Sequence, residues 1–219
     1  MPMLATALLV ATACAAAEAA PAGAHPVDAD WILARLARPS PSRTGFVELR
    51  DSALLKAPLR IAGEYRRPDA DTLVREVRVP YAETTTIAAD RTGAGTVRIE
   101  RAGQSPRVFP LARVPELVGL QASFGALLAG DRARLEQHFA LASDGTRQRW
   151  TLVLTPRDAT LAAKLRALVL YGRGAELRCI ETRPAGAGAV QRTLLAGAAR
   201  AAAGVEPTTA LVALCHTAP

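Results

Sequence analysis

FVELRDSALLKAPLRIAGEYRRP, residues 46–68, is the stretch that decides the fold. In residues 59–66, Leu, Ile, Gly and Tyr alternate with Arg, Ala, Glu and Arg, and Phe46 begins a shorter apolar run. A period of two is that of a β-strand, because successive side chains point to opposite faces of a sheet. Asp51 interrupts the pattern and Pro68 ends it, since proline cannot donate a hydrogen bond to a neighbouring strand. The stretch therefore predicts two consecutive strands.

The same unit recurs along most of the chain. Further short strands separated by polar turns are expected at residues 72–79, 82–89, 96–101, 107–111, 139–142, 147–155, 167–171, 176–182 and 190–195. Strands at intervals of about ten residues are typical of an antiparallel meander. Hairpin turns are predicted at Ser143-Asp144-Gly145, where Asp-Gly lies between apolar runs, and at Gly172-Arg173-Gly174. The predicted fold class is mainly β with helices (α+β).

Helices are predicted where the apolar spacing becomes helical. A first helix is capped by Asp28 or Asp30, and short helices are expected at residues 131–138 and 159–165. Residues 115–130 form a longer helix. Its apolar face consists of Leu117, Leu120, Phe124, Leu127 and Leu128. This face has to cover the sheet, and ordinary core packing and a lid over a cavity would give the same pattern.

The first residues have the composition of a secretory signal. Residues 3–17 are apolar but too short to span a bilayer as a helix, and small residues follow them. We therefore expect residues 1–24 to be a cleaved signal peptide and residues 27–195 to form one domain. Residues 196–219 are an alanine-rich tail, for which a helix and disorder both remain open. Cys14 lies in a sequence similar to a lipoprotein cleavage box, with alanine where Leu or Val is usual.

The net charge of +7 rests almost wholly on arginine, because Lys56 and Lys164 are the only lysines. A charge of this sign is compatible with nucleic acid binding. The arginines are, however, spread along many strands without a dense block, and no aromatic-basic motif accompanies them. We interpret them as a solvated surface and predict no nucleic acid partner, while a weaker attraction to anionic lipid headgroups remains open.

Cys179 and Cys215 are the cysteines outside the leader. In an oxidising compartment an isolated pair is a candidate disulfide. The alternative is a buried strand cysteine and a free thiol in the tail. We favour the bridge because it would fix the tail. His25, His138 and His216 have no spacing typical of a metal site, so we expect no metal and no cofactor.

Known catalytic motifs are absent from the sequence. It contains no G-x-S-x-G, H-E-x-x-H, P-loop or dinucleotide-binding pattern. Glu48 with Glu64, and Glu83 with Glu100, are carboxylates that an acid-base mechanism could use. Carboxylates at alternating strand positions are more often outward ion-pair partners of neighbouring arginines, which is our interpretation here. The sequence therefore predicts a protein that is not an enzyme.

Four stretches carry a family resemblance: residues 46–68, VRIER at 97–101, ALLAGD at 126–131 and WTLVLTPRD at 150–158. Together they resemble the LolA-like outer-membrane lipoprotein carrier family, and most closely its divergent LolA-related branch associated with aryl-polyene clusters. The similarity spans about residues 27–182. After it, the chain has Gly-Ala-Gly-Ala where a related branch reads Gly-Asp followed by Arg-Ser.

The resemblance implies a curved antiparallel sheet that forms an incomplete β-barrel, with a helical lid over its apolar concave face. It implies a periplasmic monomer that binds the acyl chains of a lipoprotein or lipid-like cargo. Membrane-bound donor and acceptor proteins would be its partners. The cavity wall is predicted from Leu59, Ile61, Tyr65, Trp150, Leu152 and Leu154, and the lid from Leu117, Leu120, Phe124 and Leu127. Alternatives are a lipoprotein-sensing regulatory module of the same fold, and an accessory enzyme in acyl or polyene lipid assembly.

Overall fold

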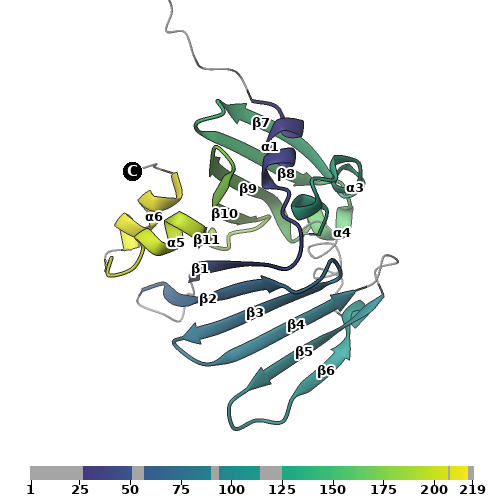
Figure 1. The fold of residues 1–219 in the computed structure, drawn as a ribbon, viewed down its shortest axis with the longest axis vertical. Helices are drawn as coiled ribbons and strands as arrows, with labels where there is room; N and C mark the ends of the chain where they lie inside the picture. Colours follow the sequence, from purple (N-terminus) through teal and green to yellow (C-terminus); the bar gives the residue numbers. More distant parts are fainter. Residues whose placement is uncertain (1–26, 51–56, 90–93, 114–124, 207, 217–219) are drawn as a thin grey trace, which may run out of the picture.

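The computed structural model describes residues 27–50, 57–89, 94–113, 125–206 and 208–216. Its strands are β1 (Ser42–Arg50), β2 (Leu59–Arg67), β3 (Thr72–Val79), β4 (Glu83–Ala89), β5 (Gly95–Arg101), β6 (Arg107–Pro110), β7 (Phe139–Gly145), β8 (Trp150–Pro156), β9 (Leu165–Arg173), β10 (Glu176–Pro184) and β11 (Gln191–Leu195). Its helices, shown with the strands in Figure 1, are α1 (Ala29–Leu36), the 3-10 helix η1 (Leu111–Arg113), α3 (Arg132–Glu136), α4 (Ala159–Ala162), α5 (Ala196–Ala201) and α6 (Thr208–His216). Residues 125–129 are also helical.

The strands form one antiparallel sheet in the order β6-β5-β4-β3-β2-β1-β11-β10-β9-β8-β7. β11, the last strand in the sequence, lies at the centre, where it pairs with β1 on one side and β10 on the other. β6 and β7 lie at the two ends of this order, and no pairing of described residues joins them. The predicted antiparallel, incompletely closed sheet with helices is thus confirmed.

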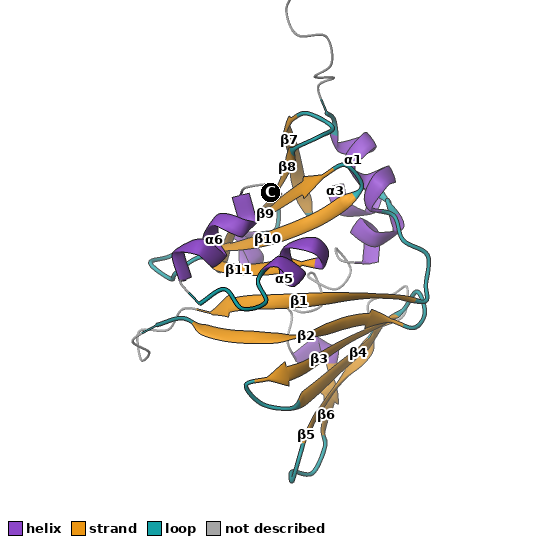
Figure 2. Ribbon diagram, turned by 60° about the vertical axis from the view of Figure 1, so that its left-hand side comes forward, coloured by secondary structure: helices purple, strands orange, loops and turns teal. Residues whose placement is uncertain are grey.

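Alternation along β1 places two apolar clusters on opposite faces of the sheet. Phe46 belongs to the larger cluster, which includes α1 and the inner sides of β7 to β10, whereas Val47 belongs to a smaller cluster with α5 and α6. Figures 1 and 2 show α1 and α3 on one side of the central strands and α5 and α6 on the other. The concave face is thus covered by the N-terminal helix and the convex face by the C-terminal helices.

Local sequence explains where α1 begins and which side it buries. The Asp28 carboxylate accepts a hydrogen bond from the Trp31 amide at 2.7 Å, which satisfies one of the free N–H groups of the first turn. Ile32, Leu33 and Leu36 recur at helical spacing and are buried in the larger cluster. The helix predicted from residue 28 onward is therefore confirmed.

Both predicted hairpins form, between β7 and β8 and between β9 and β10, but their turns lie a few residues later than predicted. Ser143 to Gly145 belong to β7, and the turn follows at residues 147–148, because Thr146 and Arg149 exchange two backbone hydrogen bonds of 2.9 and 3.1 Å. The second turn consists of Gly174 and Ala175. Gly172 belongs to β9. A Cβ there would lie 2.0 Å from the Trp150 ring, so this glycine makes room for an aromatic side chain rather than for a turn.

The alanine-rich tail, for which helix and disorder were both open, contains the helices α5 and α6. Ala198, Ala202 and Leu211 are buried against the convex face. Small side chains allow α5 to approach the sheet closely, which is the packing reason for this composition.

Candidate functional site

The structure contains a mainly apolar cavity of about 190 Å³. It lies between the end of α1, the start of β1, the strands β2 and β3, the turn between β9 and β10, and the start of α5. Its apolar wall comprises Leu36, Tyr65, Leu73, Leu128, Leu177 and Leu195. Its polar edge carries Arg38, Ser42, Arg43, Thr44, Arg66, Arg67 and Glu176. The site is therefore amphipathic.

The cavity lies where the sheet is interrupted. β11 has 5 residues and pairs with β1 only from Phe46 to Leu49. The first part of β1, residues 42–45, extends past the end of β11, so its free edge is turned toward the beginning of β10. Ser42 and Thr44 on one side and Glu176 and Leu177 on the other all line the cavity. We call this gap the β1–β10 opening.

The predicted wall residues are distributed unevenly around this cavity. Tyr65 lines it. Ile61, Trp150, Leu152 and Leu154 lie instead in the larger apolar cluster, at most 2% exposed, and Leu59 packs against that cluster. Ligand contact by these residues stays a prediction.

Of the predicted lid, only Leu127 falls among the described residues, where it is buried in the same cluster. Leu117, Leu120 and Phe124 lie outside the described residues. Four further leucines line the cavity and were not predicted from the sequence: Leu36, Leu73, Leu177 and Leu195. They lie near the ends of different elements, and only the topology brings them together.

A chain of ion pairs runs across the concave face of β1, β3, β4 and β5. Glu48 pairs with Arg50 at 2.6 Å and with Arg75 at 2.7 Å, Arg75 lies 4.0 Å from Glu83, and Glu83 pairs with Arg101. The predicted pairing with arginine is confirmed. The predicted outward orientation is wrong for Glu48, which is 6% exposed and shares the face of Ile61, its partner on β2. It is also wrong for Glu83, whose side chain is 9% exposed and which pairs with the buried Val77 of β3. Charge is tolerated inside because each carboxylate has guanidinium partners.

The polar chain also reaches Tyr65 of the cavity. Burial raises the pKa of the Tyr65 phenol above its ordinary value, and the nearby positive charge of Arg75 offsets this only in part. The hydroxyl is therefore protonated at neutral pH and available as a hydrogen-bond donor. The Arg75 guanidinium also lies over the Phe46 ring, 5.0 Å from its centre. Arg75 thus links the ionic part of the concave face to its aromatic part.

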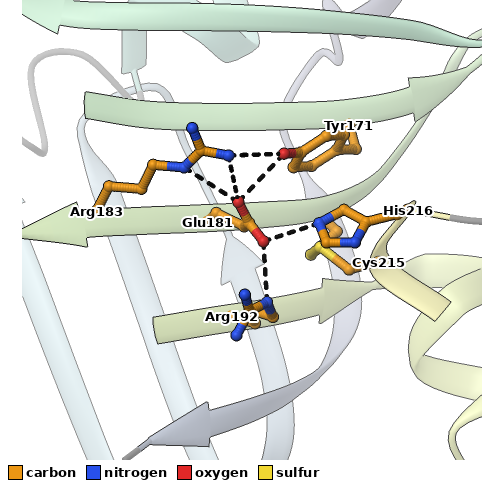
Figure 3. Close-up of a disulfide and its surroundings, with 7 residues drawn as sticks. Tyr171, Glu181, Arg183, Arg192, Cys215 and His216 are labelled. Atoms are coloured by element: carbon orange, nitrogen blue, oxygen red, sulfur yellow. Dashed lines mark hydrogen bonds and ion pairs between the residues drawn. A yellow bond between two sulfur atoms is a disulfide. The ribbon is translucent and has the colours of Figure 1, made fainter. Parts of the chain in front are cut away.

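The convex face carries a second polar network, next to a disulfide between Cys179 of β10 and Cys215 of α6. As Figure 3 shows, the Glu181 carboxylate accepts from Arg183 at 2.8 Å, Arg192 at 2.9 Å and Tyr171 at 3.1 Å, and lies 2.8 Å from His216. The bonded pair is the one considered in the sequence analysis. Together these interactions attach α6 to the sheet.

Glu181 should make the stability of the fold depend on acid pH. Burial by itself raises its pKa, but the hydrogen bonds from Arg183 and His216 and the charge of Arg192 outweigh burial, and the pKa lies below its ordinary value of 4.5. The ionised group therefore stabilises the fold at pH values above 4.5, and this contribution is lost as the pH falls through the lower folded-state pKa.

We expect the free energy of unfolding of the wild type to fall more steeply between about pH 5 and pH 3 than that of Glu181→Gln. Urea denaturation at a series of pH values measures both slopes. Glu206→Gln, at an exposed position, is the control and should retain the wild-type dependence. Equal slopes for the wild type and Glu181→Gln would contradict this assignment.

Glu181, Cys215 and His216 are the one group of potential metal ligands among the described residues, with ligand atoms within 4.8 Å of one another. The Cys215 sulfur is bonded to Cys179 and is not a free thiolate. The three residues therefore do not fit a metal centre.

Comparison with known proteins places the chain in a family. The family model described as outer membrane lipoprotein carrier protein LolA-like matches residues 19–218. A crystal structure of a LolA superfamily protein from Nitrosomonas europaea shares 13% sequence identity, with a TM-score of 0.39 over 78% of this chain and 92% of that chain. No curated protein matches. Among the described residues, no helix is long and apolar enough to cross a membrane. The match over most of the chain shows that this protein belongs to the LolA-like outer membrane lipoprotein carrier family.

Proposed function

We propose that the protein is a periplasmic carrier that holds an acyl chain of a lipid or lipidated protein in the cavity at the β1–β10 opening and delivers it towards the outer membrane. The observation that carries the proposal is an apolar cavity located at an interruption of the sheet, where a chain can enter without breaking strand pairing. Family membership supports it. Residues 1–24 would direct export, and donor and acceptor proteins in the two membranes would load and release the cargo to and from a monomer.

The size of the cavity limits the binding free energy that a buried acyl chain can contribute. A dry protein cavity of about 150 Å³ accommodates benzene, so a cavity of about 190 Å³ accommodates a short segment of one acyl chain. Burying each methylene contributes about 0.8 kcal/mol, and five methylenes would therefore give about 4 kcal/mol, which corresponds to roughly millimolar affinity. Tight binding of cargo needs further contacts, either with more of the chain or with its headgroup.

Filling the cavity should block binding. Leu73 of β3 lines it, and Leu73→Trp adds an aromatic ring at a strand position where tryptophan is well accepted. We expect the affinity for a fluorescent fatty acid to fall about tenfold or more, because the space for the chain is lost, while the melting temperature changes little. Fluorescence titration and thermal unfolding measure the two effects.

The matched control is Val108→Trp on β6, at a side chain that is 57% exposed and lies outside the cavity. It should bind the probe as the wild type does. If Leu73→Trp also keeps the wild-type affinity, the chain does not occupy this cavity. If the wild type binds no fatty acid and no lipidated peptide, the carrier proposal is wrong.

A further inference from the structure

A second, strongly basic depression lies beside the cavity. This depression has a volume of about 340 Å³ and is lined by Pro41, Ser42, Arg43, Arg66, Arg67, Pro68 and Val74. Four of these residues, Ser42, Arg43, Arg66 and Arg67, also line the apolar cavity. None of the described residues that line the second depression is a carboxylate. An apolar chamber and a cationic entrance therefore share one boundary.

Among the described residues, the one carboxylate that lines the apolar cavity already has partners within the protein. Glu176 accepts a hydrogen bond from the backbone N–H of Gly197, and its other oxygen lies 3.6 Å from Arg178. Arg38, at the same edge, directs its guanidinium to the carbonyl oxygens of Arg35, Ala37 and Ala175 rather than to a carboxylate. Glu176 therefore does not balance the positive charge of the arginines at the boundary.

Two arginines face each other across β1 and β2 at this boundary. Arg43 lies directly opposite Arg66 in the strand pairing, and like charges in this position are unfavourable. Arg66 has Glu76 at 3.2 Å. Arg43 is exposed and forms no ion pair in the part of the chain that the structure describes. An anion bound between the two arginine side chains would relieve this repulsion.

Arg67 is the stronger indication of an anion-binding site, because its side chain is buried. It is only 9% exposed and donates to the Arg38 carbonyl at 3.1 Å, but it forms no ion pair with a described carboxylate. Asp69, in the turn that follows, accepts hydrogen bonds from Thr72 and from the Asp71 amide, and the charge of Arg67 acts on it more weakly than these hydrogen bonds. A buried guanidinium normally has an anionic partner, since removing its charge from water is costly. Its partner is therefore to be sought in the depression that it lines.

We propose that the cargo carries a negatively charged headgroup, a phosphate or a carboxylate, while its chain occupies the apolar cavity. The headgroup binds at the edge of the sheet, where Arg43 and Arg66 from one face and Arg67 from the other line both depressions. The planar guanidinium fork fits both oxyanions with paired hydrogen bonds. The headgroup contacts supply the binding energy that a short buried chain segment lacks. This inference rests on the proposed carrier function and specifies the ligand class for it.

The test compares ligands that share one chain and differ in charge. Dodecyl phosphate, laurate and dodecyl maltoside are titrated calorimetrically, each below its critical micelle concentration. We expect at least one of the two anionic ligands to bind about tenfold more tightly than the neutral one at low salt, and this difference to shrink as salt screens the charges. Preference for phosphate or for carboxylate then identifies the headgroup.

Arg43→Gln should lower the affinity for the anionic ligand about three- to tenfold, which is the range of an exposed to partly buried charge-assisted contact. The affinity for dodecyl maltoside should not change. Arg43→Lys keeps the positive charge but lacks the planar guanidinium. Its affinity for the anionic ligand should lie between that of the wild type and that of Arg43→Gln. Arg107→Gln on β6 removes the same charge at an exposed position outside both depressions and should have no effect. Thermal unfolding verifies that each variant is folded.

Equal affinity for charged and neutral ligands would overturn the inference and leave the carrier function standing. Inorganic phosphate that binds as tightly as dodecyl phosphate would also overturn it, because the anion site would then be independent of the cavity. The inference would also be overturned if Arg43→Gln lowered the affinity for the neutral ligand as much as that for the anionic ligand. Absence of binding for all three amphiphiles would refute the carrier function itself.

Discussion

Leu152→Ala is expected to lower the free energy of unfolding by about 3–5 kcal/mol, the upper part of the range for leucine in a packed core. Leu152 is 0% exposed and lies between its strand partners Ser143 and Leu170, within the cluster that α1 covers. Truncation would leave a void that this tightly packed region cannot fill. Urea denaturation measures the change, and Val108→Ala at an exposed position should change the stability by less than about 0.5 kcal/mol.

The same variant distinguishes a core residue from a cavity wall. Residues that line an empty cavity have fewer contacts to lose, so truncation there should cost only about 1–2 kcal/mol and should weaken fatty acid binding. If Leu152→Ala shows that smaller loss together with weaker probe binding, the sequence-based assignment of Leu152 to the ligand wall is right, and the packed arrangement in the structure is not the ligand-bound one.

Removing the disulfide should have an effect of similar size. The bond joins residues separated by 36 positions, and a closed loop of this length restricts the unfolded chain enough to stabilise the fold by about 4 kcal/mol in the loop-entropy model. The double variant Cys179→Ala/Cys215→Ala should therefore unfold at a markedly lower urea concentration. Wild-type protein assayed in reducing agent serves as the matched control. Its unfolding midpoint in urea should approach that of the double variant.

Thiol alkylation provides an independent measurement for the disulfide. Both cysteines should resist alkylation in the native and in the unfolded protein until a reductant is added. Two thiols that react in unfolded, unreduced protein would show that the bond is absent. An equal stability of variant and wild type would show that the cluster around Ala198, Ala202 and Leu211 holds α5 and α6 by itself.

Strands and their faces could be predicted because a period of two is a local property. Residues 59–66 form β2 as expected. The turns were misplaced because the sequence signal for a turn does not report tertiary neighbours. Gly172 was assigned to a turn on its residue type, whereas the Trp150 ring packed against it accounts for the glycine.

The cavity could not be predicted for a related reason. Alternation tells which residues share a face, but not whether that face is packed or open. Ile61 and Tyr65 share the inner face of β2, yet Ile61 lies in the core and Tyr65 at the cavity. The difference arises from α1 and from the short β11, which determine where the concave face is covered. The cationic boundary was missed because Arg43 and Arg66 are distant in sequence and come together only through the pairing of β1 with β2.

The central place of β11 has a consequence for the order in which the chain can assemble. β1 and β10 are joined through this strand, which is formed by residues 191–195. Until those residues have been synthesised, the sheet consists of two halves, each with a free edge in what becomes the middle of the finished structure. Contacts so distant in sequence form slowly. A chain that ends prematurely before β11 would expose two unpaired apolar strands, a known route to edge-to-edge aggregation.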